Sequence, residues 1–185
     1  MADEQRKEEQ QQKNIMPEEE IFRQRKDKLM RLRQEEGYDP FQQDHWDVKH
    51  TLSYVKENYA SLKEEEWSED LIQTAGRVMI VRRHGKTAFV TFEDEYERLQ
   101  LCFQFDVLGE KDYTFFKKWV DAGDFLGVTG VPFRTQRGEL TLAVKSFCLL
   151  SKALRPMPEK WHGLKEMEVR YRQRYVDRLA NPEVK

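Results

Sequence analysis

The sequence predicts a mainly β protein with flanking α-helices, in which a five-stranded barrel follows amino-terminal helices and precedes a basic helical connector. Three observations support this fold class. Five short runs of alternating apolar and polar residues lie between residues 74 and 149. Turn-forming residues separate these runs, for example at Gly85. Apolar residues at helical spacing occur before the runs and once among them.

The chain before the first strand is predicted to hold a tail and then helices. Residues 1–14 are almost entirely polar and charged, so we expect a disordered tail. Residues 15–73 form the predicted helical region. Pro17 opens a helical pattern that Gly37 closes, and a shorter pattern spans residues 51–63.

The five predicted strands cover residues 74–83, 87–92, 98–105, 124–133 and 140–149, with one helix at Glu110–Val120 between the third and the fourth. This order is typical of the OB-fold, a Greek-key barrel that binds oligonucleotides. We therefore expect an OB-fold domain over residues 74–150. Element order alone does not exclude a different small barrel.

Alternation within the strands predicts which side chains enter the core. We expect inward-facing side chains at Val78, Ile80, Ala88, Val90, Phe92, Leu99, Leu101 and Phe103. Phe89 and Gln100 then face outward. If Phe92 and Glu97 close the turn, antiparallel pairing places Phe89 opposite Gln100 and Val90 opposite Leu99.

Arg77 shares this outer face, so Arg77, Phe89 and Gln100 together form a candidate reader of one base: a cation, a stacking ring and an amide. Structural roles explain the same residues equally well. Phe89 would then lie under the amino-terminal helices, Gln100 would cap a turn, and Arg77 would pair with an acidic residue of the 93–97 turn.

Charge divides the chain into an acidic first part and a basic second part. Residues 1–73 carry a net charge of −7 and residues 74–185 carry +5, which favours a polyanionic partner without requiring one. The first helix adds candidate contacts to a nucleic-acid backbone, although charged runs are usually solvated faces. These candidates are Arg23, Lys26, Arg31 and Arg33.

Several other classes of function find no support in the sequence. The two cysteines, Cys102 and Cys148, lack metal-ligand spacing and are expected to be reduced. No catalytic residue, phosphate-binding loop or metal site is predicted from the histidines or glycines. No apolar run is long enough to cross a membrane. The polar amino terminus lacks a targeting signal, so we expect a cytoplasmic location.

The carboxy-terminal segment carries a family resemblance. Residues 151–185 begin as a proline-containing linker and continue as a basic helical pattern at residues 164–179. LLSKALRPMPEKWHGLKEMEVRYRQRYVDRLANPEV, at Leu149–Val184, resembles the segment between the anticodon-binding and catalytic domains of lysyl-tRNA synthetases. AGRVMIVRRHGKTAFVTFED, RLQL and TQRGEL are similar to the OB domain of the same family.

This resemblance implies a tRNA partner, the lysine tRNA bound through its anticodon. The central uridine would stack on Phe89 and contact Gln100, while Arg77 and Glu139 occupy matching positions. Two segments depart from the family pattern: residues 93–97, where a glycine is usual, and residues 42–49.

The resemblance also implies that residues 151–185 end at the start of a missing catalytic domain. Synthetases of this family are homodimers that use ATP and magnesium to attach lysine. We expect no cofactor in this chain and no aminoacylation by it alone. Two alternatives remain: a stand-alone binder of single-stranded nucleic acid, and a helical fragment that mediates synthetase association.

Overall fold

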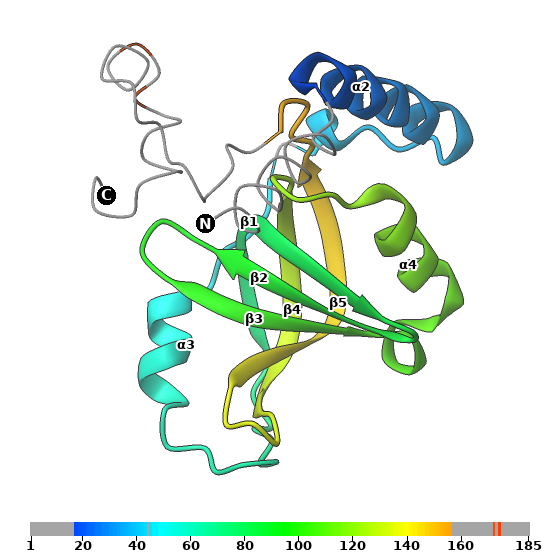
Figure 1. Cartoon of the computed structure of the whole chain (residues 1–185). Coiled ribbons are helices and arrows are strands. Elements are labelled where there is room, and N and C mark those ends of the chain that lie inside the picture. The colour runs from blue at the N-terminus through cyan, green and yellow to red at the C-terminus, as the bar shows by residue number, and fades with distance from the viewer. Residues whose placement is uncertain (1–16, 44, 157–171, 173, 175–185) are drawn as a thin grey trace, which may run out of the picture. The chain divides into compact units, whose positions relative to one another are not determined.

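Five strands form a closed barrel in the computed structural model, which describes residues 17–43, 45–156, 172 and 174 (Figure 1). They are β1 (Ile72–His84), β2 (Thr87–Glu93), β3 (Arg98–Gln104), β4 (Phe125–Arg134) and β5 (Leu140–Ser151). Around the barrel the order is β1-β2-β3-β5-β4, and β4 pairs with β1 to close it. Only β3 and β5 run parallel. The predicted five-stranded OB-fold is confirmed.

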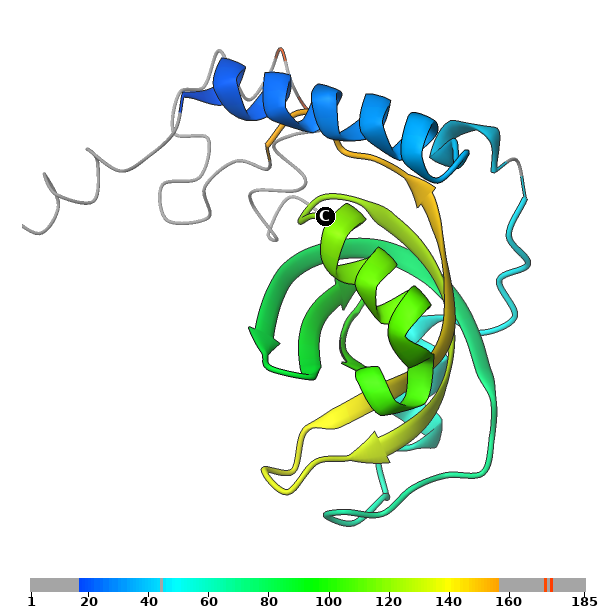
Figure 2. The ribbon, with the colours of Figure 1, turned by 90° about the vertical axis from the view of Figure 1, so that its right-hand side faces the viewer.

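Helices flank this barrel. They are α2 (Glu18–Glu35), the 3₁₀ helix η1 (Pro40–Gln42), α3 (Leu52–Asn58) and α4 (Phe105–Trp119). Figure 2 shows α4 beside the barrel, where it buries Phe116 and Trp119. The sequence predicted that this helix starts at Glu110, whereas it starts five residues earlier, at Phe105. Gly109, at φ +79°, interrupts the helical backbone, and a first turn precedes it.

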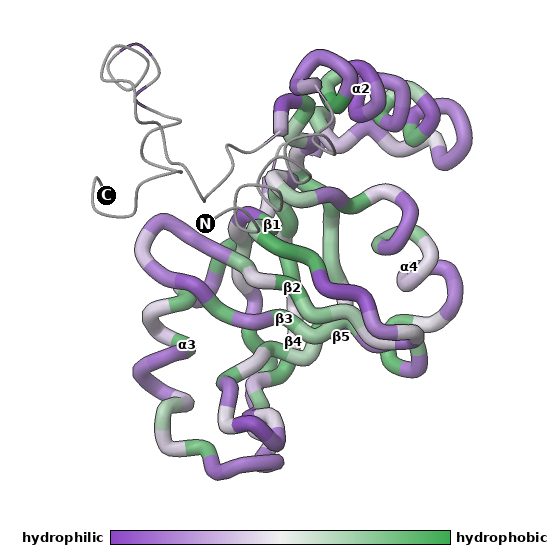
Figure 3. The backbone as a smooth tube through the Cα atoms, viewed as in Figure 1, coloured by the Kyte–Doolittle hydropathy of each residue, from purple (hydrophilic) through white to green (hydrophobic). Residues whose placement is uncertain are grey.

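The barrel core contains nearly all the side chains that alternation assigned to it. Ala88, Val90, Phe92, Leu101 and Phe103 are fully buried. Leucines of α2 and α3 join the same core, which explains why these helices have one apolar side. Figure 3 shows apolar residues concentrated along the strands, while α2 is largely hydrophilic.

Two predicted details of the strands are wrong. The β2–β3 register places Val90 opposite Leu101 and Phe89 opposite Cys102, two residues from the predicted pairing. The reason is the turn, because β2 runs to Glu93 and Asp94 bonds the backbone of the turn that follows. A shift of two residues keeps each side chain on the same face of the sheet. The predicted inward and outward positions in β2 and β3 are therefore unchanged.

The other error concerns β1. The register shifts between Val78 and Ile80, so Ile80 pairs with the outward Thr91 while Val81 pairs with Val90. Ile80 is therefore not an inward residue. An extra residue in one strand moves every later side chain to the opposite face. A prediction from alternation that does not include the β-bulge therefore assigns the residues after it to the wrong face.

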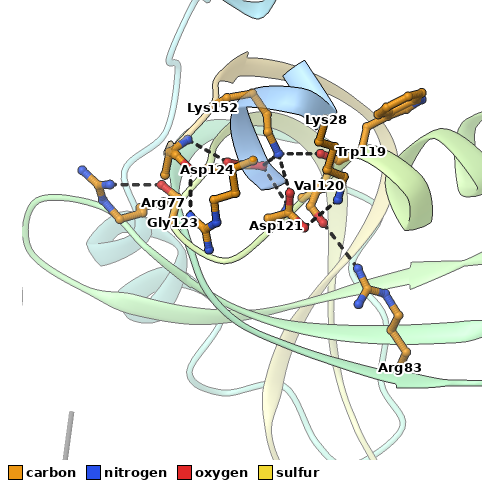
Figure 4. A network of polar contacts seen from close by, with 11 residues as sticks. Lys28, Arg77, Arg83, Trp119, Val120, Asp121, Gly123, Asp124 and Lys152 are labelled. Carbon is orange, nitrogen blue, oxygen red and sulfur yellow. Dashed lines mark hydrogen bonds and ion pairs between the residues drawn. The ribbon is translucent and has the colours of Figure 1, made fainter. Parts of the chain in front are cut away.

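A buried lysine joins the end of β5 to the loop before β4 (Figure 4). The Lys152 Nζ donates to the Trp119 carbonyl at 2.7 Å, to Asp121 Oδ2 at 2.7 Å and to Asp124 Oδ2 at 2.6 Å. Its side chain is completely buried. Lys28 of α2 donates to the other Asp121 oxygen at 2.7 Å. These contacts attach the second half of α2 to the barrel.

Burial and ion pairing oppose each other in this network. Burial acts to raise the pKa of Asp121, but Lys152 and Lys28 outweigh it and leave the pKa lowered. Burial lowers the pKa of Lys28, against the attraction of Asp121. Burial raises the pKa of Asp124, and Lys152 together with two backbone N–H groups acts against that rise. Removal of one charged partner would leave the others buried without compensation, so each charge of the network depends on the rest.

Residues Arg25–Leu154 form one compact unit that contains the whole barrel, and the described residues outside this range belong to a second unit. The predicted tail, residues 1–14, lies outside the described residues. So does nearly all of the predicted basic connector. Among the residues described here, no helix is long and apolar enough to cross a membrane.

Candidate nucleic-acid interface

Part of the outer surface of the barrel is covered by the chain that precedes α3. Trp46 donates its indole N–H to the Thr74 carbonyl of β1 at 3.0 Å. A Cβ atom built at Gly127 of β4 would lie 2.3 Å from the Trp46 ring, so only glycine permits this approach. The indole covers β1 and β4 at this point. The candidate site therefore lies on the part of the outer face formed by β2, β3 and the first part of β5.

Phe89 lies in the middle of this outer face. Its side chain is half-buried and packs against a small cluster made by Cys102 of β3, Phe133 of β4 and Ala143 of β5. The fully buried side chains on either side of it, Ala88 and Val90, belong to the main core. Phe89 is therefore an outer-face residue that, within the described part of the chain, packs on strands and not beneath the amino-terminal helices.

Gln100 lies beside Phe89 on the next strand. It pairs with Thr91, two residues along β2 from Phe89, which makes it a diagonal neighbour of the ring. Its amide nitrogen donates to Thr141 Oγ1 of β5 at 2.9 Å. The β2–β3 turn is capped by Asp94, whose Oδ1 accepts from the Glu97 N–H, and the Gln100 side chain bonds Thr141 instead of this turn. The bond to Thr141 uses one amide N–H and fixes the amide plane, so the carbonyl oxygen and the second N–H remain for a ligand.

Arg77 shares the outer face but lies apart from the other two. It pairs with Glu93, four residues along β2 from Phe89, a separation of roughly 13 Å. Its guanidinium donates to the Gly123 carbonyl at 3.0 Å and stacks over Phe125, 4.2 Å from the ring centroid. Burial lowers the pKa of Arg77, and the charges of Glu93 and Asp124 act to raise it. The three predicted partners therefore do not form one compact reader.

Arg82 holds the place that the sequence pattern assigned to Arg77. It lies directly opposite Phe89 in the β1–β2 ladder, and its side chain is exposed. The β-bulge between Val78 and Ile80 puts Arg82 on the outer face, so uninterrupted alternation places it on the other one. The available signal was the cluster of cations around the Gly85 turn: Arg82, Arg83 and Lys86.

Glu139 is exposed at the end of the β4–β5 turn. Its backbone N–H donates to Thr135 Oγ1, and its carbonyl accepts from Thr141 Oγ1 at 3.2 Å. Thr141 is also the partner of Gln100. The turn residue and the amide are thus linked through one threonine, which places Glu139 at the border of the outer face.

The candidate contacts on α2 are all exposed, but two of them already have acidic partners. Arg31 pairs with Glu35 at 2.9 Å and Arg33 with Asp39 at 3.0 Å. Arg23 and Lys26 are the other two exposed cations. Groups of His, Cys, Asp and Glu side chains able to hold a metal ion are absent from the described part of the chain.

Comparison with known proteins agrees with this geometry. Residues 72–150 match the tRNA anticodon family, an OB-fold nucleic acid binding domain. The chain is also similar to curated lysine–tRNA ligases. It is 43% identical to that of Thermosipho melanesiensis over 86% of this chain and 32% of the relative.

Two further relatives show the same extent of similarity. The lysine–tRNA ligase of Thermoanaerobacter sp. is 43% identical over 90% of this chain and 32% of its own length. That of Methanoculleus marisnigri is 45% identical over 85% and 30%. The chain spans about a third of the length of the curated relatives it matches.

Proposed function

We propose that this chain, whose residues 72–150 match the family of OB-fold nucleic acid binding domains, binds the anticodon loop of a tRNA that accepts lysine. The observation that carries the proposal is the arrangement around Phe89. A half-buried aromatic ring lies on the open outer face, with an arginine opposite it and a fixed amide beside it. Such a ring stacks on an unpaired base, and the polar neighbours contact its edge and its phosphate.

The proposed preference for uridine follows from the amide of Gln100. Because the amide nitrogen donates to Thr141, its carbonyl oxygen is the acceptor offered to a base stacked on Phe89. Uridine carries an N3–H that donates to such an oxygen. Cytidine in the same position has a lone pair at N3, which faces that oxygen without a bridging proton. A uridine at the centre of the loop is therefore preferred over a cytidine.

The proposal separates binding from chemistry. The names of the relatives describe a ligase reaction, and this chain covers about a third of their length. We propose that the chain binds tRNA without attaching lysine, since the sequence lacks recognisable adenylation motifs. Binding itself requires no cofactor, and ATP and magnesium would serve the ligase reaction alone. Pairing of two copies, and a cytoplasmic location shared with tRNA, are parts of the same proposal.

A titration with anticodon stem-loops tests the function. The purified chain is mixed with a labelled stem-loop that has a central uridine, and with a matched loop that has a central cytidine. The proposal predicts tighter binding of the uridine loop, with the preference lost in Gln100→Ala. Equal affinity for both loops and for an unstructured strand of the same length would instead support a general binder of single strands.

A further inference from the structure

We propose that Trp67 is a second stacking plate on the same surface, which holds a different unpaired base from the one that stacks on Phe89. This inference rests on the proposed function, since it concerns the path of the same RNA. Trp67 precedes β1 and is 49% exposed. Its indole stacks on Phe133 of β4, with the ring centroids 4.3 Å apart and the planes at 11°. One face of the indole is thus covered by Phe133, and about half of the residue remains exposed to a planar ligand.

Trp67 belongs to the outer face by its backbone position. It forms an antiparallel bridge with Phe133, and Phe133 pairs with Thr141, the partner of Gln100. Residues that pair across antiparallel strands share a face. Gln100, Thr141, Phe133 and Trp67 therefore form one row across the sheet. Phe133 also packs in the small cluster on which Phe89 rests.

The plate is held in place before any ligand arrives. Glu65 and Ser68 donate their backbone N–H groups to the carbonyls of Arg134 and Pro132, and Arg134 N–H donates to the Glu66 carbonyl. Residues 65–68 thereby pair with the last residues of β4, past those that pair with β1. Arg134 fastens the preceding segment with a guanidinium bond to the Ala60 carbonyl at 2.7 Å. A preorganised ring loses little conformational freedom on binding, which favours affinity.

The distance between Phe89 and Trp67 requires that the two rings stack on two different nucleotides. Four strand steps of about 4.8 Å lie between Phe89 and the segment that carries Trp67, a distance of roughly 19 Å along the sheet. One base cannot contact both rings. The polar groups between the rings, the Gln100 amide above all, suit the edges of bases on a continuous strand.

Three carboxylates adjoin Trp67 and limit the part of an RNA strand that it can contact. Glu64, Glu65 and Glu66 adjoin the ring in sequence and are exposed, so the exposed ring is bordered by charge. Carboxylates also repel phosphates, which directs the RNA backbone away from this segment. The contribution of Trp67 to RNA affinity is therefore stacking, and it is independent of salt.

The test combines protein variants with abasic RNA. Affinity is measured for the full chain, Trp67→Ala, Trp67→Phe and Phe89→Ala, with stem-loops in which each loop nucleotide in turn lacks its base. Trp67→Ala should weaken binding of the intact loop by about 5- to 150-fold. The loss should vanish for one abasic position, and Phe89→Ala should couple to a different one. Trp67→Phe should keep most of the affinity, and Phe41→Ala, which removes another half-exposed ring, should keep all of it.

Three results would overturn the inference. If Phe89 couples to one loop position while Trp67→Ala binds every loop as the unchanged chain does, the proposed function stands and the second plate is wrong. The second plate is equally wrong if Trp67→Ala changes self-association in sedimentation and leaves RNA affinity intact. If neither residue couples to any position, both the function and the inference fail. A loss from unfolding is recognised by the melting temperature, which Trp67→Phe should preserve.

Discussion

Phe89 lies directly opposite Cys102 in the β2–β3 ladder, and the ring packs against the cluster that contains this thiol. Cys102 is only 2% exposed although its strand position faces outward. Burial raises the pKa of the Cys102 thiol to about 11. The outer face therefore has a small apolar floor of its own, and Phe89 is part of what covers it.

This relationship predicts thiol reactivity. In a Cys148→Ser background, Cys102 is the one thiol of the chain, and it should react slowly with an alkylating reagent at pH 8 because its thiolate is scarce and covered. Phe89→Ala should make the reaction faster, whereas Phe125→Ala, elsewhere on the barrel surface, should not. An unchanged rate in Phe89→Ala, measured by mass spectrometry on folded samples, would contradict the packing of this ring on Cys102.

A second prediction separates the two outer-face arginines by salt dependence. Arg82 is exposed opposite the stacking ring, and Arg77 is held by the Gly123 carbonyl and Phe125. Arg82→Ala should reduce the slope of log affinity against log salt by about 1. Arg77→Ala should change that slope less. Identical slopes for the two variants in a titration from low to physiological salt would count against the assignment of Arg82.

A third prediction concerns the buried lysine. Lys152→Met leaves Asp124 buried without its cation, so the free energy of unfolding should fall by about 3–5 kcal/mol. Lys118→Met, which breaks an exposed pair with Glu35, should lower the free energy of unfolding far less. Urea unfolding of both variants checks this. A Lys152→Met protein as stable as its parent would show that the charges of this network are dispensable.

The same network predicts a dependence on pH. The pKa of Asp121 is lowered from its usual 3.8 in the folded chain, so its carboxylate stabilises the fold above that pH and loses this contribution as the pH falls below it. The difference in melting temperature between the parent and Asp121→Asn should shrink below about pH 4. A difference that grew as the pH fell would contradict the stabilising role of this carboxylate.

Alternation was sufficient to predict the barrel and the two faces of β2 and β3, because one face of each strand is buried and the other is open. It failed at the β-bulge of β1, where Met79 interrupts a pattern that otherwise continues smoothly. Arg82 was missed for that reason. Trp67 was missed because its segment lacks a strand pattern, and its pairing with β4 is made by backbone bonds and by stacking on Phe133. A residue pattern reveals which side chains are buried and which are exposed. Neither the β-bulge of β1 nor the pairing of the Trp67 segment with β4 produces such a pattern.

The central claim is that Phe89 stacks on a base while Gln100 reads its edge, and paired measurements on the same samples test it. The melting temperature and the affinity for uridine-centred and cytidine-centred stem-loops are measured for the parent, Phe89→Ala and Gln100→Ala. Loss of the stacking plate should weaken binding by roughly 1–3 kcal/mol with little change in stability. Gln100→Ala should also remove the preference for uridine. A large fall in the melting temperature of Phe89→Ala, of the kind expected for a core cavity of about 3–5 kcal/mol, with normal binding by the folded fraction, would contradict this claim.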